Sequence, residues 1–148
     1  MYKIIVSLTS YPKRINTVKK TIESIFNQTL KADEIILWLS EEDFPGGLLD
    51  LPLELCGLCG MNGFTIEWVK ENLKSHKKYF YVLRNNENKI VITIDDDMYY
   101  SPNMIKQLYE SYERFPNAIS ARRVRRILKK QEGFAPYSNW ITTAEEIR

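Results

Sequence analysis

The chain has few of the residues on which several common kinds of site depend. Its 148 residues include one histidine, His76, and two cysteines, Cys56 and Cys59. A structural zinc site needs four good ligands, so this Cys-x-x-Cys lacks enough partners. A thioredoxin-like redox pair is an alternative. Because leucines surround the pair, we expect two reduced thiols packed in the interior.

Glycine-rich loops and long apolar runs are also missing. The six glycines form neither a P-loop nor a dinucleotide-binding fingerprint, which disfavours NTPases and Rossmann dehydrogenases. No apolar run is long enough to cross a bilayer. The first residues lack the basic region and cleavage site of a signal peptide. We therefore expect a cytoplasmic protein, and peripheral association with the inner membrane stays an open alternative.

An excess of charge of one sign is absent as well, since 21 basic residues face 19 acidic ones and the net charge is +2. Six of the basic residues crowd into the segment Arg122–Lys130, which could track RNA phosphates. That segment has no interleaved aromatic residues, and the rest of the chain is not basic. An RNA-binding protein is therefore the least favoured alternative, and we expect no nucleic-acid partner.

Apolar segments alternate with helical patterns along the chain. This alternation predicts an α/β fold with a mostly parallel sheet and helices on both faces. The segment Phe64–Trp68 alternates apolar and polar residues, so we expect it nearer a sheet edge. The segments predicted as strands are Lys3–Leu8, Glu34–Leu39, Phe64–Val69, Ile90–Ile94 and Ala118–Ala121.

The helical patterns have the three- and four-residue spacing of amphipathic helices. We expect Phe80 and Leu83 to face inward, and Pro12 to lie in the first turn of the first helix. After Arg123 the pattern loosens, which predicts an α/β domain over residues 1–123 and a basic arm over residues 124–148. The predicted helices are Pro12–Phe26, Pro52–Cys59, His76–Arg84 and Pro102–Phe115.

The run Asp95-Asp96-Asp97 directly follows the apolar segment Ile90–Ile94. Open α/β sheets bind ligands at the carboxyl ends of their strands, where these carboxylates are expected. Like charges so close repel each other unless a cation or a proton compensates them. The simplest compensation is Mg²⁺ or Mn²⁺, which takes oxygen ligands and holds a phosphate-bearing substrate. The alternative is a solvated turn.

Two further segments are expected at the same edge of the sheet. In Thr9–Arg14, Tyr11 could stack on a base and Arg14 could pair with a phosphate. In Ser75–Lys78, a lysine at a helix N-terminus could assist anion binding. A capped turn and plain surface charges are the respective alternatives. Carboxylates, cations and an aromatic ring in one cleft fit a metal-bound nucleoside diphosphate.

The motifs just described resemble those of a known family. The segments Ser7–Ile15 and Ser24–Thr29 resemble the N-terminal signature of GT-A glycosyltransferases, especially bacterial enzymes of capsule and surface-polysaccharide synthesis. Ser75–Tyr79 and Ile92–Tyr100 are similar to two further blocks of that group. The resemblance covers residues 2–126 and implies a Rossmann-like, nucleotide-sugar-binding α/β half.

The resemblance also implies substrates and a metal. The donor would be a nucleotide sugar, with a UDP-sugar favoured, and the acceptor a saccharide or glycoconjugate. Mn²⁺ or Mg²⁺ would bridge the donor diphosphate. The family's Asp-x-Asp motif corresponds to Asp95 and Asp97. By that analogy Asp97 is the direct metal ligand, Asp95 contacts the ribose or a metal-bound water, and Asp96 is the remaining donor-side candidate.

Other donor-side residues follow from the same resemblance. Thr9, Tyr11 and Arg14 correspond to the donor-binding loop, and Lys78 to a residue near the donor. Many relatives hold the base with an acidic residue after the second strand. The segment Ser40–Asp43 offers several candidates, and the choice among them stays open.

No residue is assigned as catalytic base. Enzymes of this fold carry a second half that binds the acceptor, so we expect this chain to be the donor-binding half, naturally short or truncated. A metal-dependent glycosyltransferase is the favoured function. A catalytically inactive module that only binds nucleotide sugars is the alternative.

Overall fold

The computed structural model describes residues 2–84 and 88–142. The chain divides into two compact units, residues 1–106 and residues 107–148, which we describe separately. The functional division predicted between residues 123 and 124 stays a prediction. The elements are, in order, β1 (Lys3–Thr9), α1 (Val18–Phe26), β2 (Glu34–Ser40), α2 (Leu53–Cys56), β3 (Phe64–Val69), α3 (Lys77–Arg84), β4 (Lys89–Thr93), α4 (Met104–Arg114), β5 (Arg125–Arg126) and β6 (Ile141–Thr142).

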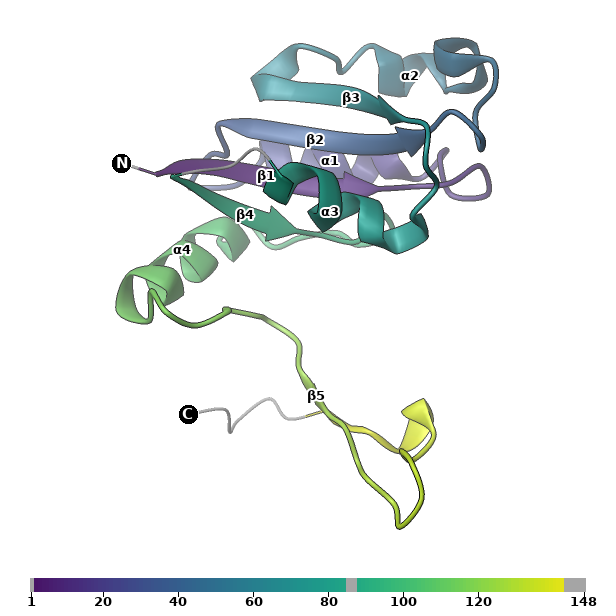
Figure 1. Ribbon diagram of the computed structural model, residues 1–148. Helices are drawn as coiled ribbons and strands as arrows, with labels where there is room; N and C mark the ends of the chain where they lie inside the picture. Colours follow the sequence, from purple (N-terminus) through teal and green to yellow (C-terminus); the bar gives the residue numbers. More distant parts are fainter. Residues whose placement is uncertain (1, 85–87, 143–148) are drawn as a thin grey trace. The chain divides into compact units, whose positions relative to one another are not determined.

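The first unit is built on a four-stranded sheet with the order β3-β2-β1-β4. All three neighbouring pairs of strands run parallel. Helix α3 lies on one face of this sheet and α1 on the other (Figure 1). The predicted α/β fold is therefore confirmed. The place of β3 at an edge of the sheet is confirmed as well, since β2 is its neighbour on one side only.

The core lies on both sides of the two central strands. Strand β1 buries five consecutive residues, which is typical of a strand covered on two faces. Helix α1 contributes Val18, Ile22 and Ile25, each almost completely buried. Burying one such side chain stabilises a fold by about 1.5–3 kcal/mol. The carboxyl ends of the strands are thus held by a rigid, apolar scaffold.

The predicted strand at Ala118–Ala121 is wrong. These residues form no strand, and the second unit instead pairs β5 with β6 in an antiparallel ladder. The segment contains only one large apolar side chain, and that residue, Ile119, is 99% exposed. A segment with so little surface to bury gains nothing from a place inside a sheet.

Two predicted helical details are also wrong. Helix α1 begins at Val18 rather than Pro12, because Tyr11–Thr17 forms consecutive turns closed by hydrogen bonds such as Arg14 N–H to the Tyr11 carbonyl at 2.9 Å. Leu83 was expected to face inward but is 59% exposed. Helix α3 buries Lys77 and Val82 instead.

The cysteines are free thiols, as predicted, although Cys59 is exposed rather than packed in the interior. Burial of part of its surface raises the pKa of the Cys59 thiol. None of the helices in the described ranges combines the length and apolarity that a membrane span requires.

Candidate functional site

A cavity of about 430 Å³ opens at the carboxyl edge of the sheet in the first unit. Its walls come from the ends of β1 and β4, the segments that follow β2 and β3, and the start of α3. Six residues predicted from the sequence as donor-side candidates line it together: Thr9, Tyr11, Arg14, Lys78, Asp95 and Asp96. Asp97 lies beside them, with its Oδ2 at 2.8 Å from Arg14 Nη1.

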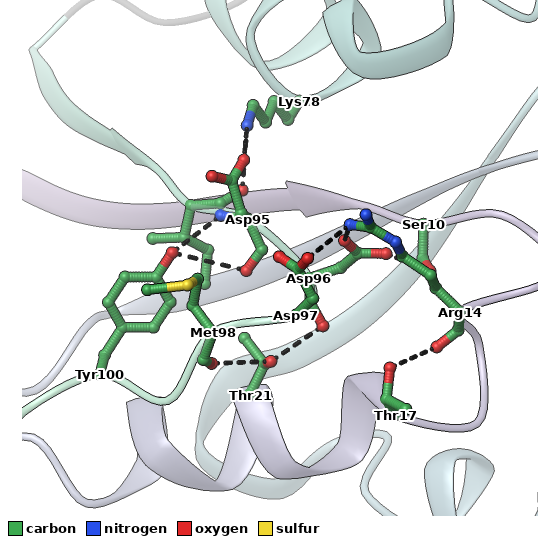
Figure 2. Close-up of polar contacts among 11 residues, drawn as sticks. Ser10, Arg14, Thr17, Thr21, Lys78, Asp95, Asp96, Asp97, Met98 and Tyr100 are labelled. Atoms are coloured by element: carbon green, nitrogen blue, oxygen red, sulfur yellow. Dashed lines mark hydrogen bonds and ion pairs between the residues drawn. The ribbon is translucent and has the colours of Figure 1, made fainter. Parts of the chain in front are cut away.

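Two cations compensate the three consecutive aspartates (Figure 2). Lys78 Nζ lies 2.6 Å from Asp95 Oδ1, while Arg14 Nη1 bridges Asp96 at 3.0 Å and Asp97 at 2.8 Å. The hydrogen bond to Asp96 and the charge of Asp97 raise the pKa of Arg14, so its guanidinium stays charged. The triplet is therefore part of an ion-pair cluster and not a merely solvated turn.

The middle aspartate anchors the site. Asp96 is only 6% exposed, and its carboxylate accepts hydrogen bonds from Ser10 Oγ at 2.6 Å and from Arg14. Its backbone carbonyl accepts another from Thr21 Oγ1 at 2.9 Å. These contacts tie the loop after β4 to the loop after β1 and to helix α1. The carboxylate of Asp96 thus accepts its hydrogen bonds from groups of the protein itself.

The neighbours of Asp96 face outward. The Asp95 and Asp97 side chains are 66% and 45% exposed. The backbone on either side of the pair is held by hydrogen bonds. The Asp95 N–H donates to Tyr100 Oη at 2.9 Å, and Thr21 Oγ1 donates to the Met98 carbonyl at 2.9 Å (Figure 2). Burial raises the pKa of Tyr100, which keeps its phenol neutral. Two exposed carboxylates are therefore presented from a fixed loop.

The loop after β1 supplies the remaining predicted groups. Tyr11 is 41% exposed, and the Arg14 guanidinium lies 5.6 Å from the centre of its ring. Thr9 Oγ1 donates a hydrogen bond to the Trp38 carbonyl at 2.7 Å, which fixes the end of β1 against β2. Tyr11 thus offers aromatic surface at the cavity, next to a cation.

The sequence did not single out three further residues of the cavity wall: Asp43, Asn72 and Lys77. Lys77 was weighed only as a helix-terminal lysine or a surface charge, but it is 1% exposed. Burial lowers its pKa, although the nearby Asp43 carboxylate opposes that shift. Asp43 belongs to the acidic segment after β2, so a partial signal existed for it. Lys77 gave only the signal of its position at a helix start and Asn72 gave none, because their roles depend on packing.

The exposed carboxylates offer oxygen ligands of the kind that a divalent metal takes. Within residues 2–84 and 88–142, no three His, Cys, Asp or Glu side chains converge on one metal position. Mg²⁺ and ions like it need fewer protein ligands, because one or two carboxylates, substrate phosphates and waters complete their coordination. Asp95 and Asp97 supply such hard oxygen ligands at the cavity rim.

The four-stranded parallel sheet, with acidic, basic and aromatic groups gathered at its carboxyl edge, is a Rossmann-like α/β fold of the GT-A type. Comparison with known families matches residues 6–146 to glycosyl transferase family 2. The match spans most of the 148 residues, so the chain belongs to this family. Membership implies a nucleotide-sugar donor and an acceptor substrate. No curated protein matched the chain.

Proposed function

We propose that this cavity binds the nucleoside diphosphate part of a donor sugar, with Mn²⁺ or Mg²⁺ held by Asp95 and Asp97. The sugar would pass to a saccharide or glycoconjugate acceptor, and a UDP-sugar is the favoured donor. One observation carries the proposal: a single cavity of about 430 Å³ gathers an exposed carboxylate, cations that include Arg14 and Lys78, and an exposed aromatic ring.

The base and the ribose would occupy the part of the cavity near Tyr11. An aromatic ring next to a cation provides a stacking surface for a planar base. Asp43 lines the same cavity and can accept a hydrogen bond from a base N–H. Asp95, which also lines the cavity, would contact the ribose or a metal-bound water. Asp43 is thus our candidate for the base-holding acidic residue that the sequence left open.

The diphosphate would lie against Arg14 and Lys78. Both cations are engaged by carboxylates, and both line the cavity, so they can share their charge with phosphate oxygens without large movements. When bound, the metal supplies a Lewis acid that neutralises charge on the leaving diphosphate. Arg14 and Lys78 add fixed positive charge at the same place.

The same proposal covers the division of the chain and its location in the cell. Residues 1–123 would form the donor-binding domain and residues 124–148 the basic arm. We also propose a cytoplasmic location, with peripheral membrane association as the alternative, and cell fractionation tests both.

Calorimetry with UDP tests the proposed function directly. UDP should bind in the presence of Mn²⁺ and lose most of its affinity when a chelator removes the metal. Binding without metal dependence would remove Asp95 and Asp97 from the proposal, and absence of binding by every nucleoside diphosphate in Mn²⁺ would refute it. Hydrolysis of a panel of nucleotide sugars then separates an active transferase from an inactive binding module.

Lys78→Ala should weaken UDP binding modestly. Lys78 Nζ contacts Asp95 Oδ1 at 2.6 Å and the Ile94 carbonyl at 3.3 Å, so the substitution removes a cation from the diphosphate side of the cavity. Because the group is partly solvated, we expect a loss of about three- to tenfold in affinity. Calorimetry in Mn²⁺ measures it, with Lys20→Ala on the exposed side of α1 as the matched control. An unchanged affinity would contradict the proposed contact between Lys78 and the diphosphate.

A further inference from the structure

Lys77 is a buried lysine in a cavity wall. Its side chain is only 2% exposed, whereas the side chain of the adjacent Lys78 is 19% exposed. A buried ammonium costs stability unless it is paired and hydrogen-bonded. A fold that keeps such a group beside a binding cavity needs partners for it, and those partners also line the cavity.

The partners form a closed triangle of two hydrogen bonds and one ion pair. Lys77 Nζ donates to Asn72 Oδ1 at 3.0 Å, and Asn72 Nδ2 donates to Asp43 Oδ2 at 2.9 Å. Lys77 Nζ also lies 3.6 Å from the same Asp43 oxygen. The three residues come from α3, from the segment after β3 and from the segment after β2. One buried cation therefore joins three elements of the cavity wall.

The triangle fixes both polar partners. Because Lys77 takes the oxygen of the Asn72 amide, the amide nitrogen is turned toward Asp43. The backbone of Asp43 is held separately, since its N–H donates to the Ser40 carbonyl at 3.1 Å. The contacts with Lys77 and Asn72 both use Oδ2 of Asp43. A carboxylate and an amide N–H are thus held in one orientation at the cavity.

We propose that Lys77 is a positioning residue, which holds Asp43 and Asn72 so that they recognise the imide edge of uracil. This inference rests on the proposed function, because it assumes that a nucleotide occupies the cavity. Uracil presents one N–H donor between two carbonyl acceptors. Asp43 accepts from that N–H, and the second N–H of the Asn72 amide donates to a neighbouring carbonyl.

The arrangement discriminates against cytosine. Cytosine presents a lone pair at N3, where uracil presents its N–H, so the carboxylate of Asp43 would face an acceptor. A polar group that loses its partner in this way weakens binding. We expect the wild-type protein to bind UDP roughly tenfold or more tighter than CDP in the presence of Mn²⁺.

Two substitutions and their double variant test the role of Lys77 by calorimetry with UDP and CDP in Mn²⁺. Lys77→Met keeps the length of the side chain and removes its charge, and it should bring the UDP-to-CDP affinity ratio close to one, mainly through loss of UDP affinity. Asp43→Asn should do the same. In the double variant, adding Lys77→Met to Asp43→Asn should change the ratio no further, because both act through one contact.

Lys74→Met is the matched control. Lys74 also lines the cavity, and it contacts Asn72 through its backbone N–H, which the substitution keeps. Removing its charge should weaken UDP and CDP equally and leave their ratio unchanged. Should Lys77→Met fail to fold, Asn72→Ala carries the test, since it breaks the link to Asp43 without removing the buried cation; it too should bring the ratio close to one.

The outcomes separate this inference from the proposed function. Wild-type protein that binds no nucleoside diphosphate in Mn²⁺ would overturn both. Binding of another nucleoside diphosphate, but of neither UDP nor CDP, would overturn only the assignment of uracil. A wild-type preference for UDP that survives in Lys77→Met, or in Asn72→Ala if the former does not fold, would overturn only the positioning role. Equal binding of UDP and CDP by the wild type would overturn the assignment of uracil and leave donor binding intact.

Discussion

Replacing Asp97 with asparagine should abolish metal-dependent binding of UDP while the melting temperature stays the same. The Asp97 side chain is 45% exposed and contacts Arg14 at the surface, so its charge adds little to stability. At the proposed metal site, by contrast, the substitution replaces an anionic oxygen ligand with a neutral amide, which binds a metal more weakly. Outer-sphere partners of metals already contribute 10–100-fold to affinity, so we expect a loss of more than about 100-fold for a direct ligand.

Calorimetry of UDP binding in Mn²⁺ measures this loss, and Mn²⁺ paramagnetic resonance reports bound metal independently. Glu67→Gln provides the matched control, because it removes an exposed carboxylate from the edge strand β3 and should change neither reading. An Asp97→Asn variant that binds UDP in Mn²⁺ as tightly as the wild type would contradict the metal site.

The second large effect is expected on stability, from Asp96→Asn. Asp96 is 6% exposed, and its carboxylate accepts hydrogen bonds from Ser10 and Arg14. An amide cannot accept both while its own N–H groups face these donors. Hydrogen bonds to charged groups contribute about 1.5–3 kcal/mol, and the partial exposure of Arg14 argues for the lower part of that range. We expect the free energy of unfolding to fall by about 2 kcal/mol.

Differential scanning calorimetry measures this change, which should lower the melting temperature by about 4–8 °C. Asp95→Asn is the matched control, because the 66% exposed Asp95 side chain contributes little to stability. The two predictions have opposite signatures: Asp97→Asn loses metal-dependent binding and keeps its stability, whereas Asp96→Asn loses stability. An Asp96→Asn variant as stable as the wild type would show that the buried carboxylate does not anchor the loop.

The sheet of the first unit was predictable from the sequence because its signal is local. Continuous apolar runs mark β1 and β2, and the alternating run marks the edge strand β3. The strand predicted at Ala118–Ala121 was wrong because the local signal there is weak: a short run with one large apolar residue carries too little information. The predicted start of α1 was wrong because backbone groups of Tyr11–Thr17 form the hydrogen bonds of turns. The spacing of apolar residues does not reveal such turns.

The gathering of the candidate site residues was predictable from topology. Parallel strands end at one edge, so residues that follow β1 and β4 meet there whatever their distance along the chain. The roles of Lys77 and Lys78 were not predictable in this way. The two lysines are adjacent, and only the orientation of α3 against the sheet decides that Lys77 is buried and Lys78 reaches Asp95.

The ion pairs of Arg14 and Lys78 bear on the order of events at the cavity. They leave the acidic rim almost neutralised, so a bare dication has little electrostatic reason to settle there. Under the proposed function, a diphosphate that arrived with the dication would give both side chains a new anionic partner in place of the carboxylates, which would then be free for the metal. Cation and nucleotide would then each raise the affinity of the other by the same factor, and we expect the cavity to bind the two together.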